Sequence, residues 1–133
     1  MASILKVDSI GKTSGSTQDT MAGLAKGWVN FNGTSTIAAR GSFNHSSLTD
    51  NTTGDYTSGI TNGVDSTNNI VFTGSCQDDD DNNKHVAGLS PVRISGGTPF
   101  TTTSVRLTTG HDANTTTLRD MDFITIAIHG DLA

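Results

Sequence analysis

The chain of 133 residues contains no glutamate, a single cysteine and only two prolines. Because Cys76 has no second cysteine to pair with, no disulfide can form within the chain. No stretch approaches the roughly 20 consecutive apolar residues that a membrane-spanning helix requires, and the first residues lack the basic segment and apolar run of a secretory signal. We therefore expect no membrane insertion, and we expect assembly in a cytoplasm.

Charged and apolar side chains are also scarce. Charged residues make up 16% of the sequence and the net charge is −5, so the surface is poorly suited to neutralising a phosphate backbone and nucleic acid is not an expected partner. Hydrophobic residues reach only 32% and aromatic residues 5%, which predicts a core that is thin or shared between subunits. If the core is shared, separated chains should unfold.

The chain does have a series of short runs rich in β-branched and aromatic residues, which begins at Gly27 and is broken by clusters of Gly, Asn, Asp and Ser. This spacing predicts an all-β fold, an antiparallel β-sandwich of about seven or eight strands that is jelly-roll-like. The candidate strands are 27–32, 35–44, 55–61, 69–76, 85–94, 101–110 and 122–130.

Two local patterns specify the first strand pair. Asn32-Gly33 separates the first two candidate strands, and both residues tolerate positive φ, which predicts a hairpin with antiparallel pairing. The second candidate strand places Ile37, Ala39 and Phe43 on one parity against mostly polar neighbours, which predicts a half-buried strand.

The first and last candidate strands carry apolar residues on both faces. Isoleucines of the last strand share one parity while most other positions are also apolar, which predicts a central strand or one covered by a neighbouring subunit. Bulky residues adjacent in the first strand must occupy both of its faces, which predicts packing on the chain's own core and against another subunit. The predicted core and subunit-packing residues are Trp28, Val29, Phe31, Ile124, Ile126 and Ile128.

The beginning of the chain has a different pattern. A candidate strand at 3–10 is followed by a Gly, Ser and Thr linker at 11–16, and then by a segment that predicts a helix of two turns with a Ser or Thr N-cap. We therefore divide the chain into an attachment and trimerisation segment, 1–26, ordered through contacts with other chains, and a β-sandwich head domain, 27–133.

No motif for catalysis is present. The sequence has no Gly-x-Ser-x-Gly elbow and no phosphate-binding glycine motif. Asp120 and Asp122 share one face of a strand, whereas the paired carboxylates of a glycosidase flank a cleft. Cys76 ends an apolar strand, as a small buried hydrophobe does, and Tyr56 is expected to begin a strand with its hydroxyl near solvent. We expect no enzymatic activity and no cofactor.

Two features invite a metal-site interpretation. The aspartate run at 78–81 offers carboxylates, but an EF-hand loop alternates its ligands and needs a central glycine and a distal glutamate, so a solvated acidic loop is the better interpretation. The histidines lack the short spacing that chelation by one chain requires. A metal site formed by one histidine from each of three chains on a symmetry axis is the alternative that the sequence leaves open. The four histidines are His45, His85, His111 and His129.

A recurring series of residues runs through the first part of the head domain: Ala-Lys-Gly-Trp-Val-Asn-Phe-Asn-Gly at 25–33, Ser-Phe-Asn at 42–44 and Thr-Asp-Asn-Thr-Thr-Gly-Asp-Tyr at 49–56. This series resembles a segment of phage tail-fibre and other virion structural proteins, common in phages of aquatic bacteria. The segments 3–10 and 124–131 are similar to the ends of the same proteins. The resemblance implies a homotrimeric, β-structured fibre head in a virion, and it covers nothing between 63 and 103.

We therefore expect a virion structural protein, tail-fibre-like, that contributes to host attachment through a bacterial surface glycan or protein and contacts other virion proteins through residues 1–26. A capsid decoration or head-fibre subunit is the alternative, which the shortness of the chain favours. A carbohydrate-binding module or glycan hydrolase ranks third, because glutamate and β-helix repeats are absent. Attachment is expected in polar loops whose weak contacts gain strength from multivalency. The predicted recognition residues are Asp50, Asn51, Asp78, Asp79, Asp80, Asp81, His111 and Asn114.

Overall fold

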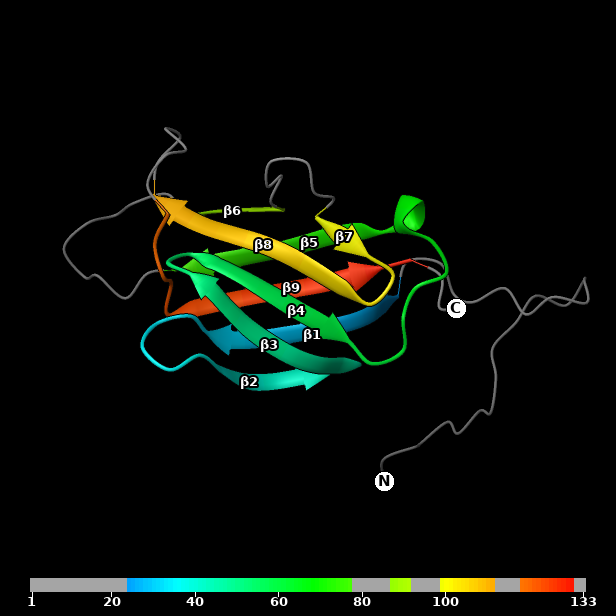
Figure 1. Ribbon diagram of the computed structural model, residues 1–133, viewed down its shortest axis with the longest axis horizontal. Helices are drawn as coiled ribbons and strands as arrows, with labels where there is room; N and C mark the ends of the chain where they lie inside the picture. The colour runs from blue at the N-terminus through cyan, green and yellow to red at the C-terminus, as the bar shows by residue number, and fades with distance from the viewer. Residues whose placement is uncertain (1–23, 78–86, 92–98, 112–117, 131–133) are drawn as a thin grey trace, which may run out of the picture.

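The computed structural model describes residues 24–77, 87–91, 99–111 and 118–130, which form two antiparallel β-sheets packed face to face (Figure 1). Sheet A has the strand order β2-β1-β9-β5; sheet B has the order β3-β4-β8-β6, with β7 paired to β8. The predicted all-β antiparallel sandwich is confirmed. The elements are β1 (Ala25–Asn32), β2 (Ala38–Phe43), β3 (His45–Thr52), β4 (Asp55–Ile60), the 3-10 turn η1 (Thr67–Asn69), β5 (Val71–Gln77), β6 (Ala87–Pro91), β7 (Phe100–Thr101), β8 (Ser104–His111) and β9 (Phe123–His129).

The core lies between the sheets and is filled by alternate strand positions. β9 buries every second residue because successive side chains of a strand point to opposite faces. Phe31 of sheet A and Tyr56 of sheet B meet edge to face, with ring centroids 5.3 Å apart. The core is thin but closed within one chain, which removes the ground for expecting that separated chains unfold. The core residues are Val29, Phe31, Tyr56, Ile60, Val105, Leu107, Met121, Ile124, Ile126 and Ile128.

Two predictions about strand pairing are confirmed: the last strand is central, and the first two strands pair antiparallel. β9 lies between β1 and β5, so it is central, and β1 pairs antiparallel with β2. The connection is longer than the Asn32-Gly33 signal predicted, because β2 begins only at Ala38 and the positive φ falls at Ser35 (57°). Gly33 serves close packing instead: a Cβ there would lie 2.5 Å from the hydroxyl oxygen of Tyr56.

The prediction that β2 is half-buried is wrong. β2 forms one edge of sheet A and is exposed along most of its length. A β-bulge shifts its register against β1, so that Ala39 lies opposite Phe31 whereas Phe43 lies opposite Trp28. Because a bulge inserts one extra residue into a strand, it breaks the parity that would have kept Ala39 and Phe43 on the same face.

The sequence pattern did not predict β3. Leu48 is the one aliphatic residue of this strand, whose burial pattern is mostly exposed. β3 is an edge strand held by backbone pairing with β4. This pairing makes the segment a strand although its residues have a low intrinsic β-propensity. Asp50 and Asn51, which were predicted in a recognition loop, therefore lie within β3, and only Thr53-Gly54 separates β3 from β4.

Several predicted elements fall elsewhere. β1 begins at Ala25, so it includes two residues that the sequence division had assigned to the attachment segment. Candidate strand 101–110 is divided between β7 and β8. The predicted strand at 3–10, the linker at 11–16 and the short helix lie outside the described residues, as does the aspartate run at 78–81.

Candidate functional site

The outer surface of sheet A carries a group of exposed apolar side chains, here named the aromatic face: Trp28, Phe43, Val71 and Phe123. Their exposed fractions are 42%, 55%, 58% and 43%. Trp28 and Phe43 are directly opposite each other in the β1–β2 register, and the Trp28 ring lies over Gly41, where a Cβ would be 3.5 Å from the indole. The face therefore extends from the β2 edge across β1 and β9 to β5.

Arg40 crosses this face and is held in place there. Its guanidinium lies 4.0 Å from the centroid of the Phe123 ring, a cation–π contact. The same group donates to the backbone oxygens of Asp122 at 2.6 Å and Phe31 at 3.2 Å, and it lies 3.4 Å from the Asp122 carboxylate. The positive charge of Arg40 is thus already paired within the chain.

The remaining outward positions of sheet A lack acidic side chains, although the sequence contains 13 aspartates. Ser75 and Thr125 hydrogen-bond to each other across β5 and β9 at 2.9 Å. In the described strands, the other outward-facing residues are small or neutral apart from His129: Asn30, Asn32, Ala38, Gly41, Thr73, Ser75, Gln77, Thr125, Ala127 and His129. The aromatic face is therefore flat, nearly uncharged and rich in rings.

The outer surface of sheet B differs in chemistry. Arg106 binds the Asp55 carboxylate through two contacts, at 2.8 Å from Nε and 2.6 Å from Nη2. Asn51 donates to Asp55 at 3.1 Å and to Thr57 at 2.9 Å. The hydrogen bonds from Arg106 hold the pKa of Asp55 below its usual value. This group of four residues, here named the polar face, satisfies its own charges.

A buried network closes one end of the sandwich. The Tyr56 hydroxyl lies 2.7 Å from the Asp120 carboxylate and 3.0 Å from the Gly33 carbonyl, and the same Asp120 oxygen accepts from the Gly54 N–H at 2.6 Å. Tyr56 is fully buried, which corrects the expectation that its hydroxyl is near solvent. Burial, followed by the bond to Asp120, raises the pKa of Tyr56 far above its ordinary value, so this phenol stays protonated and structural.

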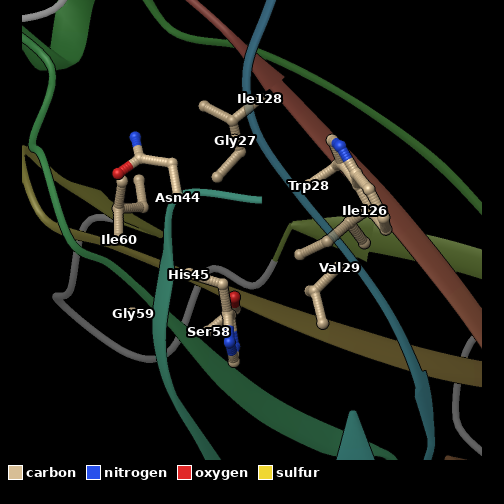
Figure 2. A pocket seen from close by; sticks show the side chains of 10 residues that line it. All are labelled: Gly27, Trp28, Val29, Asn44, His45, Ser58, Gly59, Ile60, Ile126 and Ile128. Carbon is tan, nitrogen blue, oxygen red and sulfur yellow. The ribbon is translucent and has the colours of Figure 1, made fainter. Parts of the chain in front are cut away.

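A small pocket opens between β1, β9 and the β3–β4 hairpin (Figure 2). Its volume of about 180 Å³ includes space open to solvent, which is below the roughly 300–1,000 Å³ of ordinary small-molecule sites. His45 Nε2 is buried beside it without a hydrogen-bond partner, and burial lowers the pKa of this imidazole. The pocket is too small to hold a sugar or a nucleotide.

The structure does not gather the sequence-predicted recognition residues into one site. Asp50 and Asn51 lie on β3, and His111 is the last residue of β8. Asn114 and the aspartates at 78–81 lie outside the described residues. In the part of the chain that the structure describes, no three His, Cys, Asp or Glu residues are close enough to hold a metal ion.

The residues predicted for packing divide into two groups. Val29, Phe31 and the three β9 isoleucines lie in the core, whereas Trp28 lies outside. Sequence reasoning missed Phe43, Phe123 and Arg40 as neighbours on the same surface. Parity alone places Phe123 opposite to the isoleucines, but the bulge that turns Phe43 outward has no clear sequence signal.

No protein-family model, curated protein or solved structure matches this chain. Among the described residues, no helix has the length and apolar character needed to cross a membrane.

Proposed function

We propose that this chain is a structural subunit of a bacteriophage particle, a tail-fibre-like head that works as a homotrimer and contributes to attachment on a bacterial surface. One observation supports the structural role most directly. Several polar and glycine residues of segment 25–57, which carries the sequence resemblance, take part in building the fold, among them Gly33, Asn44, Asn51, Gly54 and Tyr56. A segment of this kind specifies a scaffold and presents no reactive group.

Two residues of this segment fix the backbone where strands end. Gly54 has a φ of 65°, and a Cβ there would lie 2.6 Å from the backbone oxygen of Thr109, so glycine is required. Asn44 has a φ of 52° at the corner where the chain passes from β2 to β3. Its side chain donates to the Lys26 and Asn62 carbonyls at 2.7 and 3.0 Å and accepts from the Asn62 N–H at 2.7 Å. Both residues therefore fix the backbone conformation where the chain changes direction.

The titratable groups of the described residues favour the same interpretation. Asp55 is paired with Arg106, Asp120 with Tyr56, and Asp122 with Arg40. Burial raises the pKa of the Cys76 thiol, which opposes formation of a reactive thiolate. These three carboxylates are engaged with partners of their own chain, whereas a glycan hydrolase needs a pair of carboxylates free to act on its substrate.

The finer architectural proposals have partial support. The chain crosses between the sheets at β2–β3, β4–β5, β5–β6 and β8–β9, and such alternation supports a jelly-roll-like arrangement. The exposed aromatic face supports assembly, because exposed apolar side chains gathered on one surface are typical of contact sites between proteins. Host attachment through surface loops and anchoring through residues 1–26 are part of the proposal.

Immunogold electron microscopy of purified phage particles tests this function. Antibodies against the head domain should label the tail fibres of intact particles. Label distributed over the capsid would select the decoration or head-fibre alternative, and particles without label would contradict a virion role. Release of sugar from host envelopes by the purified protein would instead favour the hydrolase.

A further inference from the structure

We propose that the aromatic face of sheet A is the surface through which copies of this chain pack on one another, with the paired residues Trp28 and Phe43 on its β2 side. The inference rests on the proposed homotrimer and names the surface that forms it. The occupant of the face is a second copy of this chain.

The composition of the face is that of an interface core. The buried centres of protein interfaces are depleted in charged residues and enriched in Trp, Phe and Arg. The aromatic face has three exposed rings, no outward aspartate on its described strands, and one arginine whose charge is paired with Asp122. Since the chain carries a net charge of −5, a face without acidic groups is where two copies approach with least repulsion.

The exposed rings of the aromatic face contribute little to the hydrophobic core of their own chain. Trp28 alternates with Val29, which is 1% exposed, and Phe123 alternates with Ile124, which is fully buried. The core is closed on the opposite side of the same strands, so the rings on the outside are not needed to complete it. Their apolar area is left for a contact outside the chain.

The size of the surface suits a small, concentration-dependent contact. Four strands spaced about 4.8 Å apart, with seven residues rising about 3.4 Å each, present roughly 450 Å² in projection before side-chain relief is counted. Standard specific interfaces bury about 800 Å² per partner, so this area belongs to the class of weaker contacts. Packing of the face on one copy of itself would give a dimer, so in a trimer the three faces converge on the threefold axis and each contacts both neighbours.

A sugar is a weaker candidate for the occupant. Ligand sites combine apolar surface with a few polar groups that converge on the ligand. Around Trp28 the neighbours are Phe43, Gly41 and Ala127, and the amide oxygen of Asn30 is buried without a hydrogen-bond partner. These neighbours of Trp28 therefore offer few hydrogen-bonding groups that a sugar on the surface could reach.

The test uses the full chain, a double variant and a matched control. Trp28→Ser with Phe43→Ser removes two of the three exposed rings of the face, and Leu118→Ser changes an apolar residue of similar exposure, 38%, outside it. Light scattering should give a mass of three chains for the wild type and for Leu118→Ser. The double variant should give the mass of one chain, with the far-ultraviolet circular dichroism of the wild type.

Different outcomes separate the inference from the function on which it rests. A trimeric wild type with a trimeric double variant would overturn the assigned surface and leave the proposed trimer standing. A monomeric wild type at all concentrations would overturn both. If such a monomer shifts its tryptophan emission when bacterial surface polysaccharide is added, the face belongs to a sugar.

A second measurement applies if the double variant does not fold. Trp28 is the only tryptophan of the chain, so its fluorescence reports on the aromatic face without any substitution. On dilution of the wild type, the emission should move to longer wavelength over the same concentration range in which the mass falls. Emission that stays constant while the mass falls threefold would contradict the inference.

Discussion

The two outer surfaces of the sandwich are built on the same strand alternation but have opposite chemistry. On the polar face, Asp55 and Arg106 neutralise each other and Asn51 completes their hydrogen bonds. On the aromatic face, Trp28 and Phe43 meet water with about half of their surface. The polar groups of the first surface find partners within their own chain, whereas the rings of the second remain exposed to water. A single chain therefore pairs the charged groups of one outer surface and leaves the rings of the other exposed.

The inner surfaces, by contrast, should be equivalent, and this expectation gives the largest predicted effect. Ile126→Ala in sheet A and Leu107→Ala in sheet B each empty a fully enclosed core position and should cost about 2–5 kcal/mol of unfolding free energy. Chemical denaturation of both variants measures these costs. If only the sheet A variant were destabilised, the two sheets would contribute unequally to the stability of the core. The two outer faces could then not be compared as surfaces of equivalent sheets.

The next largest effect concerns the network that joins the two sheets. Tyr56→Phe removes the hydroxyl and leaves the partly buried Asp120 oxygen with one donor fewer, which should cost about 1–3 kcal/mol. Denaturation of Tyr56→Phe, Asp120→Asn and the double variant forms a thermodynamic cycle. Additive losses would show that the two groups do not interact and that the sandwich is closed at this end by other contacts.

A smaller effect is expected on the polar face. Arg106→Gln leaves the buried Asp55 without its partner and should cost about 1–2 kcal/mol, between the values for exposed and buried pairs. The solution mass should not change, in contrast to the variants of the aromatic face. Arg106→Lys is the matched control, since it keeps the charge but loses the two-point contact. A change of mass in Arg106→Gln would mean that the polar face also takes part in assembly.

This ion pair also predicts a response to acid. The pKa of Asp55 is lowered in the folded protein, so the pair stabilises the fold above the ordinary pKa of 3.8, and this contribution is lost as the pH falls through the lowered value. Arg106→Gln should therefore reduce the acid-dependent loss of stability near and below pH 3.8.

The smallest effect belongs to His45, at the rim between the two sheets. Burial lowers its pKa from 6.5, so between the lowered pKa and 6.5 the unfolded chain binds a proton that the folded chain does not. Stability is complete above pH 6.5 and declines as the pH falls through the folded pKa. Thermal melts from pH 7.5 to 5 should show less decline for His45→Gln than for the wild type.

The extent to which this fold follows from sequence differs from strand to strand within each sheet. β9 and β4 were predictable because their alternation or turn chemistry is local: isoleucines at every second position, and Gly54-Asp55 before a strand. β3 was not predictable, since an edge strand needs backbone pairing and little apolar surface. The corner at Asn44 and the bulge in β2 arise from contacts with residues far away in the sequence.

The candidate surface was only half predictable for the same reason. Trp28 was expected to face a neighbouring subunit, because it adjoins Val29 on a strand whose other face is apolar. The opposition of Phe43 to Trp28 depends on the bulge, and the position of Arg40 over Phe123 depends on the register of β2, β1 and β9. Tertiary register, which local patterns do not encode, assembles the aromatic face.

The most direct test of this account is the solution mass of the full-length wild-type chain, measured by light scattering across a dilution series while Trp28 emission is recorded. The account predicts a mass of three chains at high concentration, with emission at shorter wavelength than in the dissociated chain. A mass of one chain at every concentration, with the emission of a half-exposed indole throughout, would contradict the claim that this face is covered by other copies.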